Sequence, residues 1–224
     1  MVEHAEPNTQ MRVPLSRERV LRAAMALADE GGIDELTMRK LADDLGVKAM
    51  SLYNHVANKN DLLDGMIDEV YGEIALPAAG VEWKAKVRQL ATSAHEVMLR
   101  HPWASTLHPS QEPGPKRFRY GNALLGAFRD AGFSKEVTYD AYHIIEAYIL
   151  GFTFQVLSYQ NVDMEQMSGV VDRFMTGDFL ADYPHFTEHV RQHLGEESVD
   201  GHVDGYQLGL DLILNSLEPL RAES

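Results

Sequence analysis

Apolar side chains recur every three or four residues along most of this chain, which is the spacing of an amphipathic helix. Short segments containing glycine or proline separate the apolar stretches. The pattern predicts helices over about 16–31, 37–45, 49–55, 58–76, 83–100, 116–130, 134–160 and 203–220, with further helical turns near 164–174 and 186–194. No stretch alternates between apolar and polar residues as a half-buried strand would, so the predicted fold class is all-α.

Two predicted helices in the C-terminal half carry signs of tight packing. Apolar residues occupy most of the circumference of 134–160, so this helix is expected to be buried on more than one side. In 203–220, Gly205 and Gly209 lie on one face, and each mid-helix glycine costs about 1 kcal/mol relative to alanine. The pair therefore predicts a close approach of another helix. The helix over 116–130 is expected to bury Phe118, Ala123, Leu124, Ala127 and Phe128.

Residues 37–63 contain the signals of two short helices, a tight turn and the start of a third helix. Thr37 is a good N-cap, Gly46 supplies the left-handed residue that ends the first helix, and Asn58 caps the third. Two short helices joined in this way predict a helix-turn-helix, whose second helix lies in the major groove of DNA. The alternative is an ordinary three-helix core with a solvated polar face.

Three segments carry a family resemblance: LTMRKLADDLGV at 36–47, SLYNHV at 51–56 and NKNDLL at 58–63. They resemble the DNA-binding head of TetR-family transcriptional repressors, and within that family the tetracycline-repressor-like branch. The tail segment DGYQLGLDLILNSL, at 204–217, also resembles this branch. The resemblance implies a homodimer that binds a palindromic double-stranded DNA operator and is released by a small-molecule inducer, which we expect to be apolar.

The resemblance and the helix pattern together predict three parts. Residues 1–14 lack periodicity and are expected to be a disordered tail. Residues 15–62 are the expected helix-turn-helix DNA-binding domain, whose third helix continues to about residue 76. Residues 77–224 are the expected regulatory domain for ligand binding and dimerisation. The helix that leaves the head is either a mechanical link to this body or only a linker.

The candidate DNA contacts lie on the two short predicted helices, on the turn between them and at the start of the third helix. The planar fork of Arg39 can bond guanine O6 and N7 together, although Arg39 could instead pair with Asp43 four residues on. Lys59 lies beside free N–H groups at a helix N-terminus, which attract phosphate. The resemblance places Arg39 at a base-reading position and implies phosphate anchors at Tyr53, His55 and Lys59. The full candidate set is Thr37, Arg39, Lys48, Ala49, Met50, Ser51, Tyr53, Asn54, His55 and Lys59.

The charge of the chain is unevenly distributed, and this changes what it implies about partners. The net charge is −14, but residues 1–60 hold 8 Lys and Arg against 9 Asp and Glu. The excess acid therefore lies in the body, which repels phosphate at long range, so DNA affinity is expected to rest on a few placed cations. With 0 Cys there is no disulfide and no thiolate metal site. The absence of a signal peptide and of a long apolar run predicts a cytoplasmic protein without a membrane partner.

The body contains aromatic and polar residues that could line an inducer pocket, although aromatic residues at helical spacing are more often core. The candidates are Trp103, His108, Phe118, Phe128, Tyr142, Tyr148, Phe152 and Gln155. By resemblance His108 matches a histidine that ligates the magnesium of bound tetracycline, but Ala75 and Gln155 depart from the residues expected beside it. A magnesium–tetracycline complex is therefore not the expected ligand, and no cofactor or metal is predicted. The HxxxH pair of His185 and His189 falls on an expected exposed stretch.

An enzyme is not predicted, because no nucleophile elbow, phosphate loop or cysteine is present. The remaining alternative is a DNA-binding regulator without a small-molecule effector. It shares the head, so only the body distinguishes it: a closed, dry core favours this alternative, whereas a cavity with convergent polar groups favours a sensor.

Overall fold

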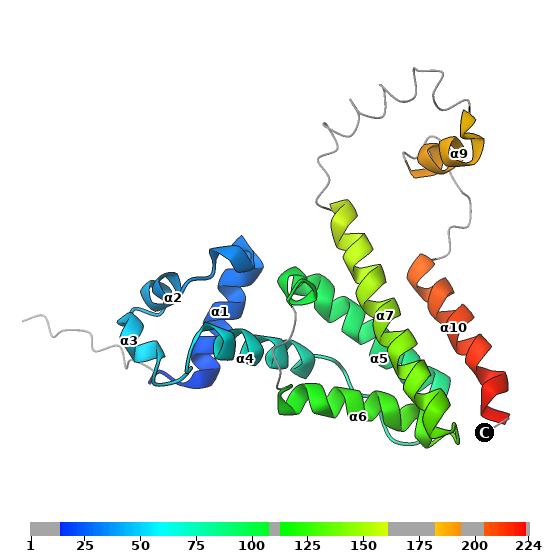
Figure 1. The fold of residues 1–224 in the computed structure, drawn as a ribbon. Helices are drawn as coiled ribbons and strands as arrows, with labels where there is room; N and C mark the ends of the chain where they lie inside the picture. The colour runs from blue at the N-terminus through cyan, green and yellow to red at the C-terminus, as the bar shows by residue number, and fades with distance from the viewer. Residues whose placement is uncertain (1–13, 108–112, 161–181, 194–203, 223–224) are drawn as a thin grey trace, which may run out of the picture. The chain divides into compact units, whose positions relative to one another are not determined.

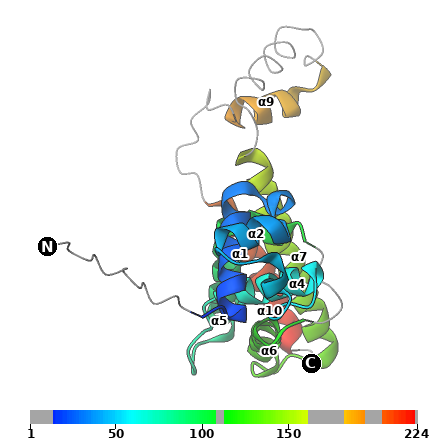
Figure 2. The ribbon, with the colours of Figure 1, turned by 90° about the vertical axis from the view of Figure 1, so that its left-hand side faces the viewer.

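The computed structural model describes residues 14–107, 113–160, 182–193 and 204–222. Every regular element in these ranges is helical, which confirms the all-α prediction. Figures 1 and 2 show the helices from two sides. In chain order they are α1 (Arg17–Gly31), η1 (Ile33–Glu35), α2 (Met38–Asp44), α3 (Ala49–Leu52), α4 (Lys59–Gly72), α5 (Trp83–Arg100), η2 (Pro102–Ser105), α6 (Pro115–Arg129), α7 (Lys135–Gln160), α9 (Pro184–His193) and α10 (Gly205–Ala222).

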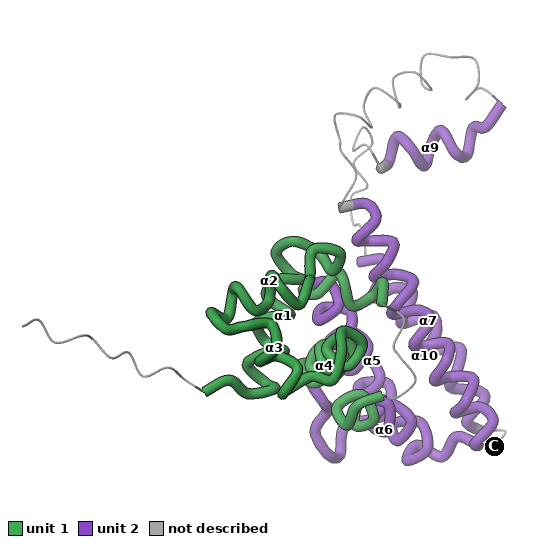
Figure 3. The backbone as a smooth tube through the Cα atoms, turned by 60° about the vertical axis from the view of Figure 1, so that its left-hand side comes forward, with its two compact units in different colours: residues 1–73, 100–119 green, residues 74–99, 120–224 purple. Residues whose placement is uncertain are grey.

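The chain divides into two compact units (Figure 3). Unit 1 comprises residues 1–73 and 100–119, and unit 2 comprises residues 74–99 and 120–224. The chain therefore passes between the units three times, and residues 100–119 group with the N-terminal helices. The predicted regulatory domain, 77–224, includes residues 100–119, so the predicted domains and the two compact units divide the chain differently.

Unit 1 is built around α1, α2, α3 and α4. Leu41 of α2, Leu52 of α3 and Leu62 of α4 are each completely buried. Burial of a leucine side chain contributes about 1.5–3 kcal/mol relative to exposure, so these three residues are a large part of what holds the short helices together. Isolated helices as short as α2 and α3 are not stable in water, hence their shape depends on this shared core.

Unit 2 buries one face of α5 and one face of α6. The inward residues predicted for 83–100 are confirmed: Val87, Leu90, Ala91, Ala94, Val97 and Met98 are all buried. The prediction for 116–130 is wrong at Phe118, which is 64% exposed. The buried stripe of α6 is Tyr120, Leu124, Ala127 and Phe128, and at 100° per residue Phe118 falls on the opposite side.

Helices α7 and α10 contact each other, and they approach closely at Gly209. A Cβ atom at Gly209 would lie 2.8 Å from Cζ of Tyr148 and closer still to its hydroxyl oxygen, so the predicted close helix approach is confirmed there. At Gly205 the same atom would be 3.6 Å from Phe152, an ordinary contact. Only one side of α7 is covered by the described residues, since Ile144, Leu150 and Phe154 remain exposed.

Several predicted boundaries differ from the structure. The helix predicted over 49–55 is α3, which ends at Leu52 and continues as turns, and the helix expected to reach 76 ends at Gly72. The predicted tail, apart from Pro14, and the helical turns near 164–174 lie outside the described residues. Within the described residues, no helix is both long and apolar enough to span a bilayer.

Candidate DNA-binding site and candidate ligand site

The turn between α2 and α3 forms because local signals stop one helix and start the next. The Thr37 side chain accepts a hydrogen bond from the backbone N–H of Lys40 at 3.1 Å, which caps α2. Gly46 has φ 65°, a left-handed conformation that glycine adopts without steric strain. The N–H of Val47 then donates to the carbonyl of Ala42 at 2.9 Å and closes the turn. These contacts end α2 and fix the turn from which α3 begins.

The ten predicted DNA-contact residues all lie on the outside of this motif or at its margin. Met50 is 75% exposed and Tyr53 is 45% exposed. Ala49, Ser51 and His55 are half-buried. The remaining exposed members are Thr37, Arg39, Lys48, Asn54 and Lys59. None of the ten belongs to the core, so all of them are accessible to a partner.

The cations of the motif fall into two groups. Lys40 pairs with Glu35 at 2.6 Å and Arg17 pairs with Asp61 at 2.6 Å. Arg39, Lys48 and Lys59 have no hydrogen-bond or ion-pair partner among the described residues, so the predicted alternative of an Arg39–Asp43 pair does not form. Three cations without an acidic partner in the described part of the chain are therefore exposed on and beside α2 and α3.

Arg17 of α1 fixes the segment that follows α3. Its guanidinium donates to the backbone carbonyl of His55 at 2.9 Å and to both carboxylate oxygens of Asp61. Asp61 also accepts the N–H of Ala57 at 2.7 Å. The hydrogen bond from Arg17 lowers the pKa of Asp61, with burial opposing it and the Ala57 N–H adding to it. The sequence pattern gave no sign of this pair, because the partners are 44 residues apart.

The described residues among the predicted ligand set are divided between the two compact units. Trp103 and Phe118 belong to unit 1, and the indole N–H of Trp103 donates to Asp29 at 2.6 Å. Phe128 is fully buried in unit 2, with its ring 5.9 Å from Trp83 and 5.6 Å from Phe133. Tyr142 is half-buried, Gln155 is exposed, and His108 lies outside the described residues.

Tyr148 and Phe152 of α7 do lie together, with ring centroids 5.7 Å apart. They surround Tyr206 of α10, which stacks on His95 of α5 at 4.1 Å. The hydroxyl of the buried Thr153 donates its one hydrogen to the carbonyl of Ile149. The hydroxyl oxygen lies 2.7 Å from Nδ1 of His95, so it accepts a hydrogen bond from that ring nitrogen. Burial lowers the pKa of His95, so the neutral ring donates through Nδ1. His95 and Tyr206 were not singled out from the sequence as site residues.

Unit 2 also contains a shallow groove of about 510 Å³, which is lined mainly by residues of α5 and α10. The lining includes Arg88, Gln89, Thr92, Ser93 and Glu96 of α5, together with Gln207 of α10. No group of three or more His, Cys, Asp or Glu side chains that could hold a metal is found in the part of the chain that the structure describes. His185 and His189 are both exposed on α9.

The fold and the exposed helix-turn-helix define a DNA-binding transcription regulator. The sequence profile of "Bacterial regulatory proteins, tetR family" matches residues 20–66, and that of "Tetracyclin repressor-like, C-terminal domain" matches residues 76–220. The chain belongs to the TetR family.

Individual relatives agree with this assignment. The chain is 33% identical over 148 residues to an HTH-type transcriptional regulator of Saccharopolyspora erythraea, covering 65% of this chain and 63% of the relative. It is 30% identical over 229 residues to the HTH-type transcriptional repressor DrrR1 of Streptomyces coeruleorubidus, covering 97% and 82%. The chain thus spans less than two thirds of the first of these relatives.

Solved structures share the fold. ActR of Streptomyces coelicolor without ligand has a TM-score of 0.74 at 24% identity, covering 94% of this chain and 98% of ActR. ActR has also been solved in complex with actinorhodin, with a TM-score of 0.72, 22% identity and coverage of 92% and 97%. BioQ in complex with its double-stranded DNA operator has a TM-score of 0.59 at 26% identity, covering 73% and 100%.

Proposed function

We propose that this protein is a cytoplasmic repressor that binds a pseudo-palindromic operator as a homodimer and is released by a small, mainly apolar inducer. The observation that carries the proposal is the set of three exposed cations, Arg39, Lys48 and Lys59, without acidic partners among the described residues. Phosphate contacts position a protein on DNA and base contacts specify the sequence. Arg39 is assigned to a guanine edge, whereas Lys59, at the N-terminus of α4, is assigned to phosphate.

The homodimer is supported by apolar side chains that the single chain leaves exposed. Leu150 and Phe154 lie one helical turn apart on α7, and Leu208 and Leu212 lie one turn apart on α10. Exposed apolar patches on a folded domain mark interaction surfaces. We propose that α7 and α10 pair with their symmetry mates as a four-helix bundle. One reading head per chain then gives two heads, and their half-sites should lie about one helical turn of DNA or more apart, roughly 34 Å.

The inducer response is supported by the ring cluster of Tyr148, Phe152, Tyr206 and His95, which joins three helices of unit 2. It combines apolar surface with few polar groups, as small-molecule sites do. ActR, which has this fold, has been solved in complex with actinorhodin. An inducer that prefers the non-binding spacing of the heads by about 2.7 kcal/mol lowers operator affinity roughly a hundredfold.

Selection from random DNA tests the operator, and a compound titration tests the inducer. Double-stranded fragments are selected on the purified protein, and the enriched sequence is footprinted. We expect a pseudo-palindrome protected over two half-sites; a single protected half-site with monomeric protein contradicts the proposal. Apolar compounds that bind are then titrated with and without operator. Because coupling is reciprocal, operator must weaken inducer binding by the factor by which inducer weakens operator binding. Equal affinities in both states favour the regulator without an effector.

A further inference from the structure

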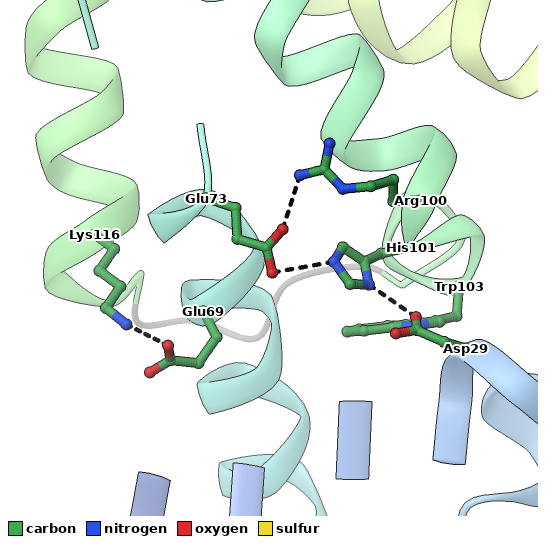
Figure 4. A network of polar contacts seen from close by, with 7 residues as sticks. All are labelled: Asp29, Glu69, Glu73, Arg100, His101, Trp103 and Lys116. Carbon is green, nitrogen blue, oxygen red and sulfur yellow. Dashed lines mark hydrogen bonds and ion pairs between the residues drawn. The ribbon is translucent and has the colours of Figure 1, made fainter. Parts of the chain in front are cut away.

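His101 lies at the centre of a polar network in unit 1 (Figure 4). Its side chain is buried, its Nδ1 lies 2.8 Å from Oδ1 of Asp29, and its Nε2 lies 3.2 Å from Oε1 of Glu73. Trp103 and Arg100 complete the network. Each nitrogen of the ring therefore meets a carboxylate oxygen.

The other partners of the two carboxylates show which groups carry the protons. Trp103 Nε1 donates to the same Oδ1 of Asp29 at 2.6 Å, and an indole N–H can only donate. Arg100 donates to Oε2 of Glu73 at 2.9 Å, and a guanidinium can only donate. Burial raises the pKa of Glu73, but the hydrogen bonds from Arg100 and His101 outweigh it, so the pKa of Glu73 lies below its ordinary value. Both carboxylates thus act as acceptors.

A neutral imidazole has one N–H and one lone pair, so it can satisfy only one of two acceptors. The other carboxylate oxygen would then face the lone pair of the ring nitrogen, which is repulsive. Only the doubly protonated imidazolium fits both contacts, with donor–acceptor distances of 2.8 and 3.2 Å. Among the described residues, the charged groups that touch the ring or its partners are Asp29, Glu73 and Arg100, and with the imidazolium their charges sum to zero.

The network joins the C-terminal ends of three helices. Asp29 lies in the last turn of α1, Glu73 directly follows α4, and His101 directly follows α5. Helix C-termini carry partial negative charge, so a cation at their junction is favoured. Glu73 and Arg100 are also the residues at which the chain passes from one compact unit to the other, at 73/74 and 99/100.

We propose that His101 is a proton-operated clamp: its imidazolium form holds the ends of α1 and α4 to the residues that follow α5, and loss of one proton opens the clamp. Imidazole is the side chain whose charge is most readily changed by one proton near neutral pH. After deprotonation one carboxylate faces a lone pair in a half-buried site, and the network keeps an uncompensated negative charge. The exit of α4 from the head is then less firmly tied, so operator affinity becomes sensitive to protons. That last step alone rests on the proposed function.

The protonation state is measured by long-range ¹H–¹⁵N NMR of the histidine rings in the full chain, with His101→Gln identifying the His101 signals. We expect both ring nitrogens of His101 to be of the N–H type at about pH 6 and one of them to lose its proton by about pH 8.5. A ring with an unprotonated nitrogen at about pH 6 overturns the proposal. A ring that keeps both protons at about pH 8.5 overturns it equally, because the clamp could not be operated.

The mechanical consequence is measured by denaturant unfolding at fixed protein concentration over the same pH range. The stabilisation of wild type over His101→Gln should fall as pH rises, because the bridging proton is lost. One linked proton changes the unfolding constant by up to about tenfold per pH unit, so the ratio of the wild-type to the variant unfolding constant should rise about tenfold or more as the pH rises. His185→Gln removes an exposed histidine without a partner among the described residues and should leave the pH profile unchanged.

Two further variants keep the test decisive if His101→Gln does not fold. Asp29→Asn and Glu73→Gln keep hydrogen-bonding groups but remove the need for a second proton, so the pH dependence should vanish in each. A profile that persists in both overturns the proposal. Operator affinity is measured over the same range in wild type and in the Asp29→Asn variant, and only wild type should change. If no DNA is bound specifically at any pH, the proposed function fails while the NMR result still decides the clamp.

Discussion

Arg17 of α1 and Asp61 of α4 form a two-pronged ion pair, with Nη2 to Oδ1 at 2.6 Å and Nη1 to Oδ2 at 3.1 Å. The same guanidinium holds the carbonyl of His55, which follows the last turn of α3. The pair therefore sets where α3 sits relative to the two longer helices, although neither residue is one of the predicted DNA contacts. The role that we propose for it in DNA binding is indirect: it positions the side chains to which the DNA contacts are assigned.

Replacement of Arg17 by alanine should weaken both the fold of unit 1 and operator binding. We expect a loss of about 1 kcal/mol of unfolding free energy, a value kept low because the two side chains are 43% and 32% exposed. Denaturant unfolding and gel-shift titration measure the two effects. Lys40→Ala removes an exposed ion pair at the same distance of 2.6 Å, and among the described residues Lys40 has no hydrogen bond or ion pair to α3. It should change both quantities much less; equal effects would show that Arg17 does not position the motif.

Asp61 also predicts the acid sensitivity of the motif. Its pKa is lowered in the folded state, chiefly by the hydrogen bond from Arg17. The stability that it contributes is thus fully present above the unfolded value of about 3.9 and is lost as pH falls through the lower folded value. The difference in unfolding free energy between wild type and Asp61→Asn should shrink from about pH 5 to 3. Asp34→Asn, at an exposed site without a partner among the described residues, is the matched control and should give no such trend.

Arg39 and Lys59 should affect DNA binding in different ways. Arg39→Ala is expected to cost about 1–3 kcal/mol on the best operator and to relax the preference at one base pair. Lys59→Ala should weaken binding to all sequences alike and reduce its salt dependence. Binding of each variant to a panel of singly substituted operators, at two salt concentrations, separates the two roles. Identical specificity profiles for the two variants would contradict the assignment.

The sequence predicted the parts of this molecule that depend on short-range signals. Thr37 and Asn58 cap their helices through residues three positions on, and Gly46 ends α2 by its own backbone conformation. The long-range pairs left no such signal, since His101 meets Asp29 and Glu73 from 72 and 28 residues away. Trp103 illustrates the consequence. Its aromatic character suggested a ligand pocket, but its N–H is committed to Asp29 in the same network.

The surroundings of the candidate ligand residues were hard to predict for a related reason. Aromatic residues occur on both faces of α6 and α7, and periodicity alone does not tell which face meets a neighbouring helix. Phe118 and Phe128 lie on the same helix, yet one is exposed and the other completely buried. Tyr148 and Phe152 gained their neighbours His95 and Tyr206 only through packing of α5, α7 and α10.

Gly209→Ala tests the close contact between α7 and α10. An alanine Cβ would lie 2.8 Å from Cζ of Tyr148 and closer still to its hydroxyl oxygen, which is held by a hydrogen bond of 2.7 Å to the carbonyl of Tyr206. The ring therefore cannot move without losing that bond, and we expect destabilisation of about 1–3 kcal/mol, as for overpacking in a core. Gly126→Ala, in α6 with no atom within 4 Å of the added Cβ, is the control and should stabilise by about 0.5–1 kcal/mol. If both variants behave alike, the contact is not tight.

The proposed dimer gives the last prediction. Leu212 on α10 is 62% exposed in the single chain, so Leu212→Glu has little to disturb in the monomer fold but would place a charge in the proposed four-helix bundle. We expect the variant to be monomeric by analytical ultracentrifugation at concentrations where wild type is a dimer, and to lose high-affinity operator binding in the same step. The two losses should coincide because the dimer fixes the spacing between two heads. Leu125→Glu, at a 38% exposed position of α6 outside the proposed bundle, is the matched control and should stay dimeric. A monomeric Leu212→Glu protein that still binds operator with wild-type affinity would disprove the link between dimer and DNA binding.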